Sequence, residues 1–189
     1  MRKSAAPLAA ALLTSIALRV APASAAAATP EARCREEVGR QGQTYLRSAV
    51  GALRHCRDQI GQGKLPASTD CSVEPVTASR VARFASRFTA KVAGKCTDGL
   101  VSGLVFGDAC FGSTTVSGLA SCEVDVHQDQ AEKLIAVLYD TGGPEAQKNR
   151  MCQATTAKAA ARVLQQSHDA LRRCKDDVNA GRLPATTSC

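Results

Sequence analysis

The chain has 189 residues, of which 24 are Lys or Arg, 17 are Asp or Glu and nine are Cys, and its formal net charge is +7. This length is sufficient for a hydrophobic core. An aromatic content of 3% argues against sites built on stacked rings, such as carbohydrate grooves and single-stranded nucleic-acid platforms. Nine cysteines in so short a chain indicate a disulfide framework, a metal cage or redox chemistry.

Residues 1–25 have the layout of a secretory signal peptide. Two basic residues precede an Ala- and Leu-rich run over 5–18, and Ala23-Ser24-Ala25 supplies the small residues that signal peptidase reads. Cleavage would remove three basic residues and no acid, so the net charge would fall from +7 to +4. We therefore predict a single helical domain over 26–189. We expect it to be secreted or periplasmic, soluble after cleavage, without a transmembrane segment, and unlikely to bind nucleic acid.

About four principal helices are predicted for the rest of the chain. Apolar residues recur in them at helical spacing, and no segment shows the alternation of a strand. Thr29 is the expected N-cap of the first helix, with Pro30 at its first position. We predict an all-α, disulfide-stapled helical bundle. The helices cover residues 29–62, 77–96, 115–140 and 144–181, with a short helix and a turn in the Gly-rich stretch 99–112.

An internal duplication organises this chain. Residues 34–71 align without a gap to residues 152–189, at a constant offset of 118. Thirteen of the 38 aligned positions are identical, including three cysteines and a shared ending G-x-L-P-A-x-T-x-C. Chance similarity between two Ala-rich helices does not align three cysteines. We infer a partial duplication, in which the second copy caps the first or marks a short relative of a longer array.

The repeated pattern is C-x21-C-x-D followed by G-[K/R]-L-P-x-x-T-x-C, and it covers residues 34–71 and 152–189. It resembles that of uncharacterised, exported, Cys-rich helical repeat proteins from bacteria. The resemblance implies helices and bacterial export. It implies no activity, and no functional residue can be carried over from it.

The cysteines are predicted to form structural disulfides. Neither C-x-x-C nor C-x-x-C-H is present, which argues against thioredoxin-type, paired-zinc and haem-attachment sites. Cys34 and Cys56 share one helix and lie about 33 Å apart at ~1.5 Å per residue, so each must pair elsewhere. If helix 77–96 folds back antiparallel, Cys96 arrives beside Cys34, and Cys71 reaches Cys56 at the opposite end. The predicted pairs are Cys34–Cys96, Cys56–Cys71, Cys110–Cys122 and Cys174–Cys189.

Cys152 is left without a predicted partner. It aligns with Cys34, but residues 152–189 contain no equivalent of Cys96, and nine is an odd number. Three interpretations stay open: a buried and inert thiol, an intermolecular disulfide that joins two chains, or a reactive thiol.

No catalytic residue, metal site or cofactor is predicted. The histidines are His55, His127 and His168, and only His127 lies among acids, in Glu123-x-Asp125-x-His127-x-Asp129. On a helix these side chains divide between two faces, so three or four metal ligands do not converge. We expect a solvated acidic face instead.

Helix 77–96 carries five basic residues at spacings of three or four, beside its apolar stripe. Such a basic stripe could bind phosphates or anionic polymers of a cell envelope. We favour a solvated face, or one that is neutralised within the fold by four acids of helix 115–140. The basic stripe comprises Arg80, Arg83, Arg87, Lys91 and Lys95, and the four acids are Glu123, Asp125, Asp129 and Glu132.

The sequence therefore predicts an exported, disulfide-stabilised helical module with a structural or binding role, whose partner is an unknown protein, lipid or envelope component. One alternative is a carrier that holds a small apolar ligand or lipid in a cavity between helices. Another is a thiol-dependent enzyme that uses Cys152, although we lean away from an enzyme. A dimer through Cys152 is a further expectation to test.

Overall fold

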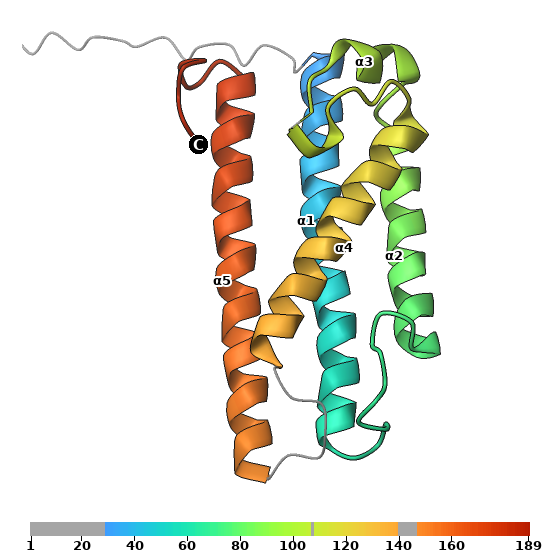
Figure 1. The fold of residues 1–189 in the computed structure, drawn as a ribbon. Helices are drawn as coiled ribbons and strands as arrows, with labels where there is room; N and C mark the ends of the chain where they lie inside the picture. Colours follow the sequence, from blue (N-terminus) through green and yellow to red (C-terminus); the bar gives the residue numbers. More distant parts are fainter. Residues whose placement is uncertain (1–28, 107, 140–146) are drawn as a thin grey trace, which may run out of the picture.

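The computed structural model describes residues 29–106, 108–139 and 147–189. The predicted signal peptide and the predicted helix start at Pro144 lie outside these residues. The described part of the chain contains helices and no strand, so the all-α fold class with four long helices is confirmed (Figure 1). The elements are α1 (Pro30–Gly61), α2 (Pro75–Ala93), α3 (Asp98–Gly103), the 3-10 helix η1 (Asp108–Cys110), α4 (Val116–Leu138) and α5 (Gln147–Asn179).

The start of α2 shows how local sequence sets a helix boundary. The Glu74 carboxylate accepts hydrogen bonds from the backbone N–H groups of Val76, at 3.1 Å, and Thr77, at 2.7 Å. Pro75 fills the first helical position, where no N–H is needed. The helix therefore begins two residues before the predicted start, because an acidic cap was not expected there. It also ends at Ala93, so Cys96 follows the helix instead of closing it.

α1 is the central helix of the bundle. It packs against α2, α4 and α5, and α2 and α5 lie on opposite sides of it (Figure 1). Both neighbours run antiparallel to α1, whereas α4 crosses it obliquely and reaches α5. α1 therefore supplies one side of the three largest helix–helix interfaces, and α2 also packs against α4.

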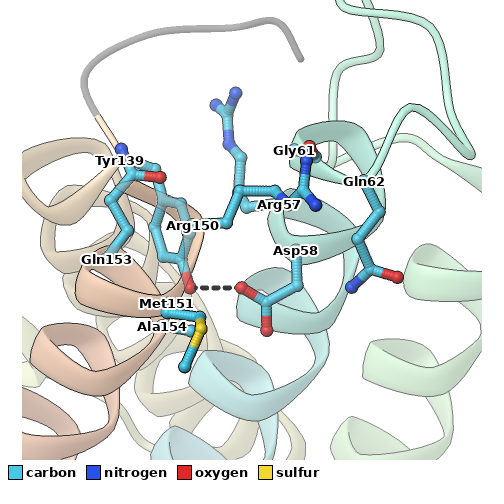
Figure 2. A pocket seen from close by; sticks show the side chains of 9 residues that line it. All are labelled: Arg57, Asp58, Gly61, Gln62, Tyr139, Arg150, Met151, Gln153 and Ala154. Atoms are coloured by element: carbon cyan, nitrogen blue, oxygen red, sulfur yellow. Dashed lines mark hydrogen bonds between the residues drawn. The ribbon is translucent and has the colours of Figure 1, made fainter. Parts of the chain in front are cut away.

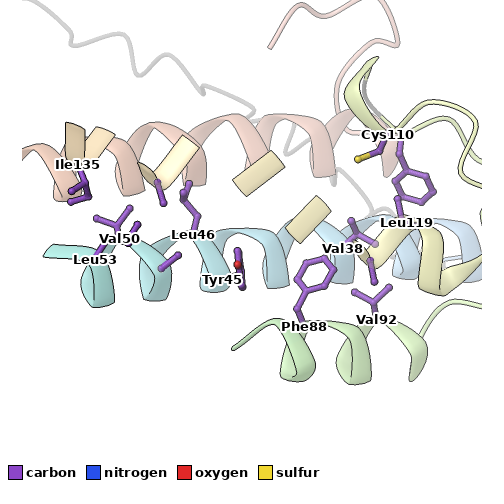
Figure 3. Packing of buried hydrophobic residues seen from close by; sticks show 14 of the residues in the cluster. Val38, Tyr45, Leu46, Val50, Leu53, Phe88, Val92, Cys110, Leu119 and Ile135 are labelled. Carbon is purple, nitrogen blue, oxygen red and sulfur yellow. The ribbon is translucent and has the colours of Figure 1, made fainter. Parts of the chain in front are cut away.

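The hydrophobic core follows α1 along its length (Figure 3). Tyr45 and Leu53 are each 2% exposed. Phe88 of α2 and Leu119 of α4 belong to the same buried cluster and are 1% and 0% exposed. Each such side chain contributes roughly 1.5–3 kcal/mol when it leaves water, so this seam is the main source of packing energy.

A glycine allows α4 to approach α1. A Cβ atom at Gly42 would lie 2.4 Å from Nε2 of His127, closer than real Cβ contacts permit. His127 fills this slot and is only 7% exposed. Its ring also lies 5.6 Å from the ring of His168 on α5, measured between centroids. Gly42 therefore sits where α1, α4 and α5 meet.

Four disulfides fasten the helices, with Cα–Cα distances from 5.0 to 5.9 Å. One joins the start of α1 to the residues after α2, and another joins the end of α1 to the loop that follows it. The pairs are those predicted from the sequence. They are Cys34–Cys96, Cys56–Cys71, Cys110–Cys122 and Cys174–Cys189.

Residues 34–71, the first segment, and residues 152–189, the second segment, end in the same turn. Lys64 N–H donates to the Gln59 carbonyl at 2.9 Å, and Arg182 N–H donates to Asp177 at 2.8 Å. The glycine before each donor has a positive φ, +69° in the first segment and +68° in the second. Only glycine adopts this conformation without strain, which explains why it stands at both positions.

The two segments also pack against each other through equivalent residues. A small space between α1 and α5 is lined by four residues of each helix, and each pair is separated by 118 positions. Leu46 and Leu164 are one of these pairs. The arrangement is a local pseudo-two-fold axis of the kind that relates subunits in a symmetric dimer. The pairs are Gln43 and Ala161, Leu46 and Leu164, Arg47 and Gln165, and Val50 and His168.

Candidate functional site

The basic stripe of α2 faces solvent. Arg83, Arg87, Lys91 and Lys95 are exposed, and Arg80 is partly exposed. Across the described ranges, no carboxylate lies within ion-pair distance of any of the five.

Three of the four acids of α4 that were expected to neutralise the basic stripe are engaged on α4 itself. Asp129 pairs with Lys133 at 2.6 Å. Glu132 accepts a hydrogen bond from Gln128 at 2.6 Å, and Glu123 lies 3.6 Å from His127. Internal neutralisation by ion pairs is therefore wrong for the described part of the chain, and the solvated alternative describes the stripe.

Two members of the basic stripe, Arg87 and Lys91, stand at the rim of a cleft between α1 and α2. The cleft has a volume of about 410 Å³. It lies between the two disulfides that fasten α1, so both walls are anchored. Its lining consists of Gln41, Thr44, Tyr45 and Ser48 from α1, and Phe84, Arg87, Phe88, Ala90 and Lys91 from α2.

The floor of the cleft is aromatic. Tyr45 and Phe88 are 2% and 1% exposed, and Phe84 is partly buried beside them. The Tyr45 hydroxyl donates to Oε1 of Gln128 on α4 at 3.0 Å. Burial, together with the nearby negative charges of Asp125 and Glu132, raises the pKa of Tyr45 to about 12. The phenol is therefore neutral at physiological pH, and the floor carries no charge.

The polar groups of the two walls differ in character. On α1, the Thr44 and Ser48 hydroxyls donate to backbone carbonyls one turn earlier, at 2.9 and 2.8 Å, so their oxygens keep lone pairs that can accept. Nε2 of Gln41 donates to Glu37 at 2.8 Å. On α2, Arg87 and Lys91 offer only donors and positive charge. The cleft thus presents acceptors on one wall and cations on the other, above an apolar floor.

A second cavity, of about 400 Å³, lies where α1, α4 and α5 meet (Figure 2). Its centre is a hydrogen bond from the Tyr139 hydroxyl to Oδ1 of Asp58, at 2.7 Å. Burial, followed by this bond, raises the pKa of Tyr139. Arg150 donates from Nη1 to the Gly61 carbonyl at 3.3 Å. These bonds tie α4 and α5 to the end of α1, so we assign this cavity a structural role.

Cys152 is a free, exposed thiol near the start of α5. The interpretation of a buried and inert thiol is therefore wrong. Within the described residues no hydrogen bond joins its sulfur to a base.

The acidic face predicted around His127 is solvated only in part. Asp125 and Asp129 are exposed, but His127 is buried and the Glu123 side chain is 18% exposed. Burial lowers the pKa of His127 and raises that of Glu123. In the part of the chain that the structure describes, no three His, Cys, Asp or Glu side chains are placed to hold a metal ion.

No family model, no curated protein and no solved structure matches this chain. None of the described helices is long and apolar enough to cross a membrane.

Sequence reasoning found the two cations of the cleft but did not connect them with the two phenylalanines of the neighbouring apolar stripe. Arg87 and Lys91 are one turn apart, as are Phe84 and Phe88, so the two pairs are neighbours on α2. That pattern is a detectable signal. The sequence of the α1 wall contains no such signal, because Thr44 and Ser48 resemble any other exposed helix positions.

Proposed function

We propose that this protein is an exported, disulfide-stabilised binding module that holds a small amphiphilic anion in the cleft between α1 and α2. The observation that carries this proposal is the pairing of Arg87 and Lys91, two exposed cations without an ion-pair partner among the described residues, with the apolar floor beneath them. An anionic head would bind the cations while the apolar part lies on Phe84 and Phe88. A mostly apolar cleft with a few polar groups is the usual form of a small-molecule site.

The size of the cleft favours a ligand with one chain or one ring system. Its volume of about 410 Å³ is near the lower end of ligand sites, which run from roughly 300 to 1,000 Å³. A two-chain phospholipid would not fit. The acceptors of Thr44 and Ser48 favour a ligand that also carries a hydroxyl or N–H donor on the side opposite its anionic group. These features support the carrier alternative in the form of a small anion carrier.

The disulfides support both the compartment and the mechanism of binding. Four disulfides are typical of proteins in an oxidising environment, in agreement with the signal-peptide pattern and the bacterial resemblance of the sequence. Cys34–Cys96 and Cys56–Cys71 fix α1 against α2 and its connecting loop before any ligand arrives. A preformed cleft loses less conformational entropy on binding than a flexible one.

Fluorescence titration with 1-anilinonaphthalene-8-sulfonate, an aromatic anion, tests this function. We expect saturable binding that decanoate displaces and decanol displaces poorly, because only decanoate carries the anionic head. The Arg87→Gln/Lys91→Gln variant should bind the probe at least tenfold more weakly, since both cations at the rim are lost.

The matched control is Arg83→Gln/Lys95→Gln, which removes the same net charge from the same basic stripe, at one residue of α2 and one just after it, but spares the cleft lining. We expect its affinity to stay within about twofold of the parent protein at moderate salt, where distant surface charges are screened. Equal losses in the two variants, or equal displacement by decanol and decanoate, would refute a site in this cleft.

A further inference from the structure

α5 exposes the face that α1 buries. Tyr45 of α1 is 2% exposed, whereas Val163, its equivalent in α5, is 62% exposed. Leu53 is 2% exposed and its equivalent Leu171 is 50% exposed. The other equivalents on this face, Thr156, Ser167 and Ala170, are also exposed, where Val38, Ala49 and Ala52 are buried.

The first segment shows what covers this face. α2 and α4 cover it together. α2 lies antiparallel on α1, where its Phe88 and Val92 are 1% and 0% exposed, and Gln128 of α4 accepts a hydrogen bond from the Tyr45 hydroxyl. Cys96, which follows α2, forms a disulfide with Cys34 near the start of α1, and their Cα–Cα distance is 5.0 Å. α2 is therefore an amphipathic helix with a cysteine one turn beyond its last buried apolar residue.

Nothing in the described ranges takes the place of α2 on α5. α5 packs against α1 and α4, and α2 lies on the far side of α1 (Figure 1). Cys152, at the position of Cys34, is exposed and unbonded. The second segment thus has the thiol and the helix face of the first without the helix that covers them.

We propose that α5 is a docking surface for an amphipathic helix of another polypeptide chain, of the same kind as α2, which becomes covalently joined through Cys152. The docked helix lies antiparallel to α5, with its cysteine at its C-terminal end. Its apolar side covers Val163. This inference does not depend on the proposed ligand of the cleft, because the two sites use different helices.

The covalent step is a thiol–disulfide exchange. The partner's cysteine arrives as a mixed disulfide with a small thiol, and the Cys152 thiolate attacks the partner's sulfur. The bond between Cys152 and the partner forms as the bond to the small thiol breaks. The small thiol leaves as a thiolate with the electron pair, so no further oxidant is needed.

Charge distinguishes this partner from a second copy of the chain. Arg162 is exposed and has no ion pair among the described residues, and it stands at the position of Thr44, which lines the cleft beside α2. An acid on the flank of the docked helix would meet Arg162. A second α5 would instead bring another Arg162, and α2 itself carries the basic stripe. The occupant we assign therefore has acidic residues beside its apolar side.

Three synthetic peptides can test this docking on the intact protein. Each carries its cysteine as a mixed disulfide with thionitrobenzoate, whose release is coloured, and the release rate is divided by the rate with a small disulfide. The basic peptide is residues 75–96 unchanged. The acidic peptide is the same segment with Arg80→Glu, Arg87→Glu and Lys91→Glu. The third peptide, which lacks an apolar side, is the acidic peptide with Phe88→Ser and Val92→Ser.

We expect the acidic peptide to react at least tenfold faster than the peptide without an apolar side. In the Val163→Asp protein this advantage should vanish, whereas Val137→Asp, on the exposed face of α4, should retain it. In the Arg162→Glu protein the basic peptide should become the faster of the two charged peptides. Cys152→Ser should release no colour.

Equal normalised rates for all three peptides would overturn the proposal, because they would show a thiol that reacts without a docking surface. An advantage that survives Val163→Asp would place the peptide elsewhere and also overturn it. Quantitative formation of a Cys152–Cys152 dimer in the absence of peptide would identify a second copy as the occupant, and would contradict the acidic partner.

Discussion

α1 and α5 align residue for residue, yet they occupy opposite environments. α1 is enclosed by three helices, whereas α5 lies at the edge of the bundle and packs on α1 and α4 (Figure 1). Both form long helices that end in the same glycine turn. Helix formation here is therefore encoded locally, while burial is decided by which neighbours each segment acquires.

α5 also depends more on charged contacts along its own length. Arg172 binds Asp169 at 2.9 Å and Asp176 at 2.7 Å, and Arg173 binds Asp169 at 2.8 Å. Such pairs are worth only a few tenths of a kcal/mol each on an exposed helix, ~0.3–0.5. The packing energy lies on the α1 side, so matched substitutions in the two segments should have unequal effects.

Disulfide removal should give the largest difference. Both Cys56–Cys71 and Cys174–Cys189 close a loop with a separation of 15 residues, and this contributes about 3 kcal/mol in the loop-entropy picture. Cys56 and Cys71 are each 2% exposed, so alanines there also leave a cavity. We expect Cys56→Ala/Cys71→Ala to cost about 4–5 kcal/mol and Cys174→Ala/Cys189→Ala about 3 kcal/mol or less, measured by urea unfolding. Equal losses would contradict the burial argument.

Truncation of the paired leucines sharpens the same contrast. Leu53→Ala should lower the free energy of unfolding by about 2–5 kcal/mol, because Leu53 is buried in the core. Leu171→Ala should cost less than about 1 kcal/mol, since half of that side chain is exposed. Chemical denaturation of the two variants measures both. A loss of more than 2 kcal/mol for Leu171→Ala would show that α5 is covered in solution.

Two glycines of α1 should respond to alanine with opposite signs. Gly42→Ala should destabilise the protein by about 1–3 kcal/mol, because the new Cβ collides with His127. Gly51→Ala should stabilise it by about 0.5–1 kcal/mol, since no atom lies within 4 Å of the added carbon and alanine favours a helix. Thermal melts followed by circular dichroism separate the two. A stable Gly42→Ala variant would show that α4 can shift away from α1.

Acidification should weaken the junction of α4 and α5. Burial, and then the positive charge of Arg172, lowers the pKa of His168, and burial lowers that of His127. Because these pKa values lie below the ordinary value near 6.5, the unfolded chain takes up protons first as the pH falls through that value. The folded state then loses stability, by at most about 1.4 kcal/mol per pH unit for each histidine. Burial raises the pKa of Glu123, so the folded state takes up this proton first as the pH falls toward 4.5. Protonation of Glu123 therefore adds stability in that lower pH range, opposite to the effect of the two histidines.

Urea unfolding at pH 7.5 and pH 5.5 tests this pH dependence. We expect His168→Gln to lose part of the difference in stability between the two values. His55→Gln, on the exposed face of α1, should keep all of it. An unchanged difference in His168→Gln would remove that histidine from the explanation.

The sequence predicted what depends on distance along the chain. Helix lengths decided which cysteines could meet, so the pairing of Cys34 with Cys96 could be worked out from residue counts. Helical periodicity identified the buried side of α1. The cap of α2 was missed because Glu74 serves as a less usual N-cap.

The features that the sequence did not predict depend on which faces of neighbouring helices pack against each other. His127 was expected in solvent because its sequence neighbours are acids, and nothing near it points to the slot that Gly42 opens on α1. The second segment has apolar residues at Leu164 and at Leu171, and only the structure decides that Leu164 faces α1. Cys152 is exposed because the face of α5 that carries Leu164, and not the face that carries Cys152, packs on α1. The cleft was missed for the same reason, since it needs the spacing of two helices.

The most direct test of the binding site is an NMR titration of the isotope-labelled protein with decanoate. The account predicts amide shift changes concentrated in residues 41–48 and 84–91, with little change along α5. Shifts centred on the cavity around Asp58 and Tyr139, or the same shifts in Arg87→Gln/Lys91→Gln as in the parent protein, would contradict a binding site between α1 and α2.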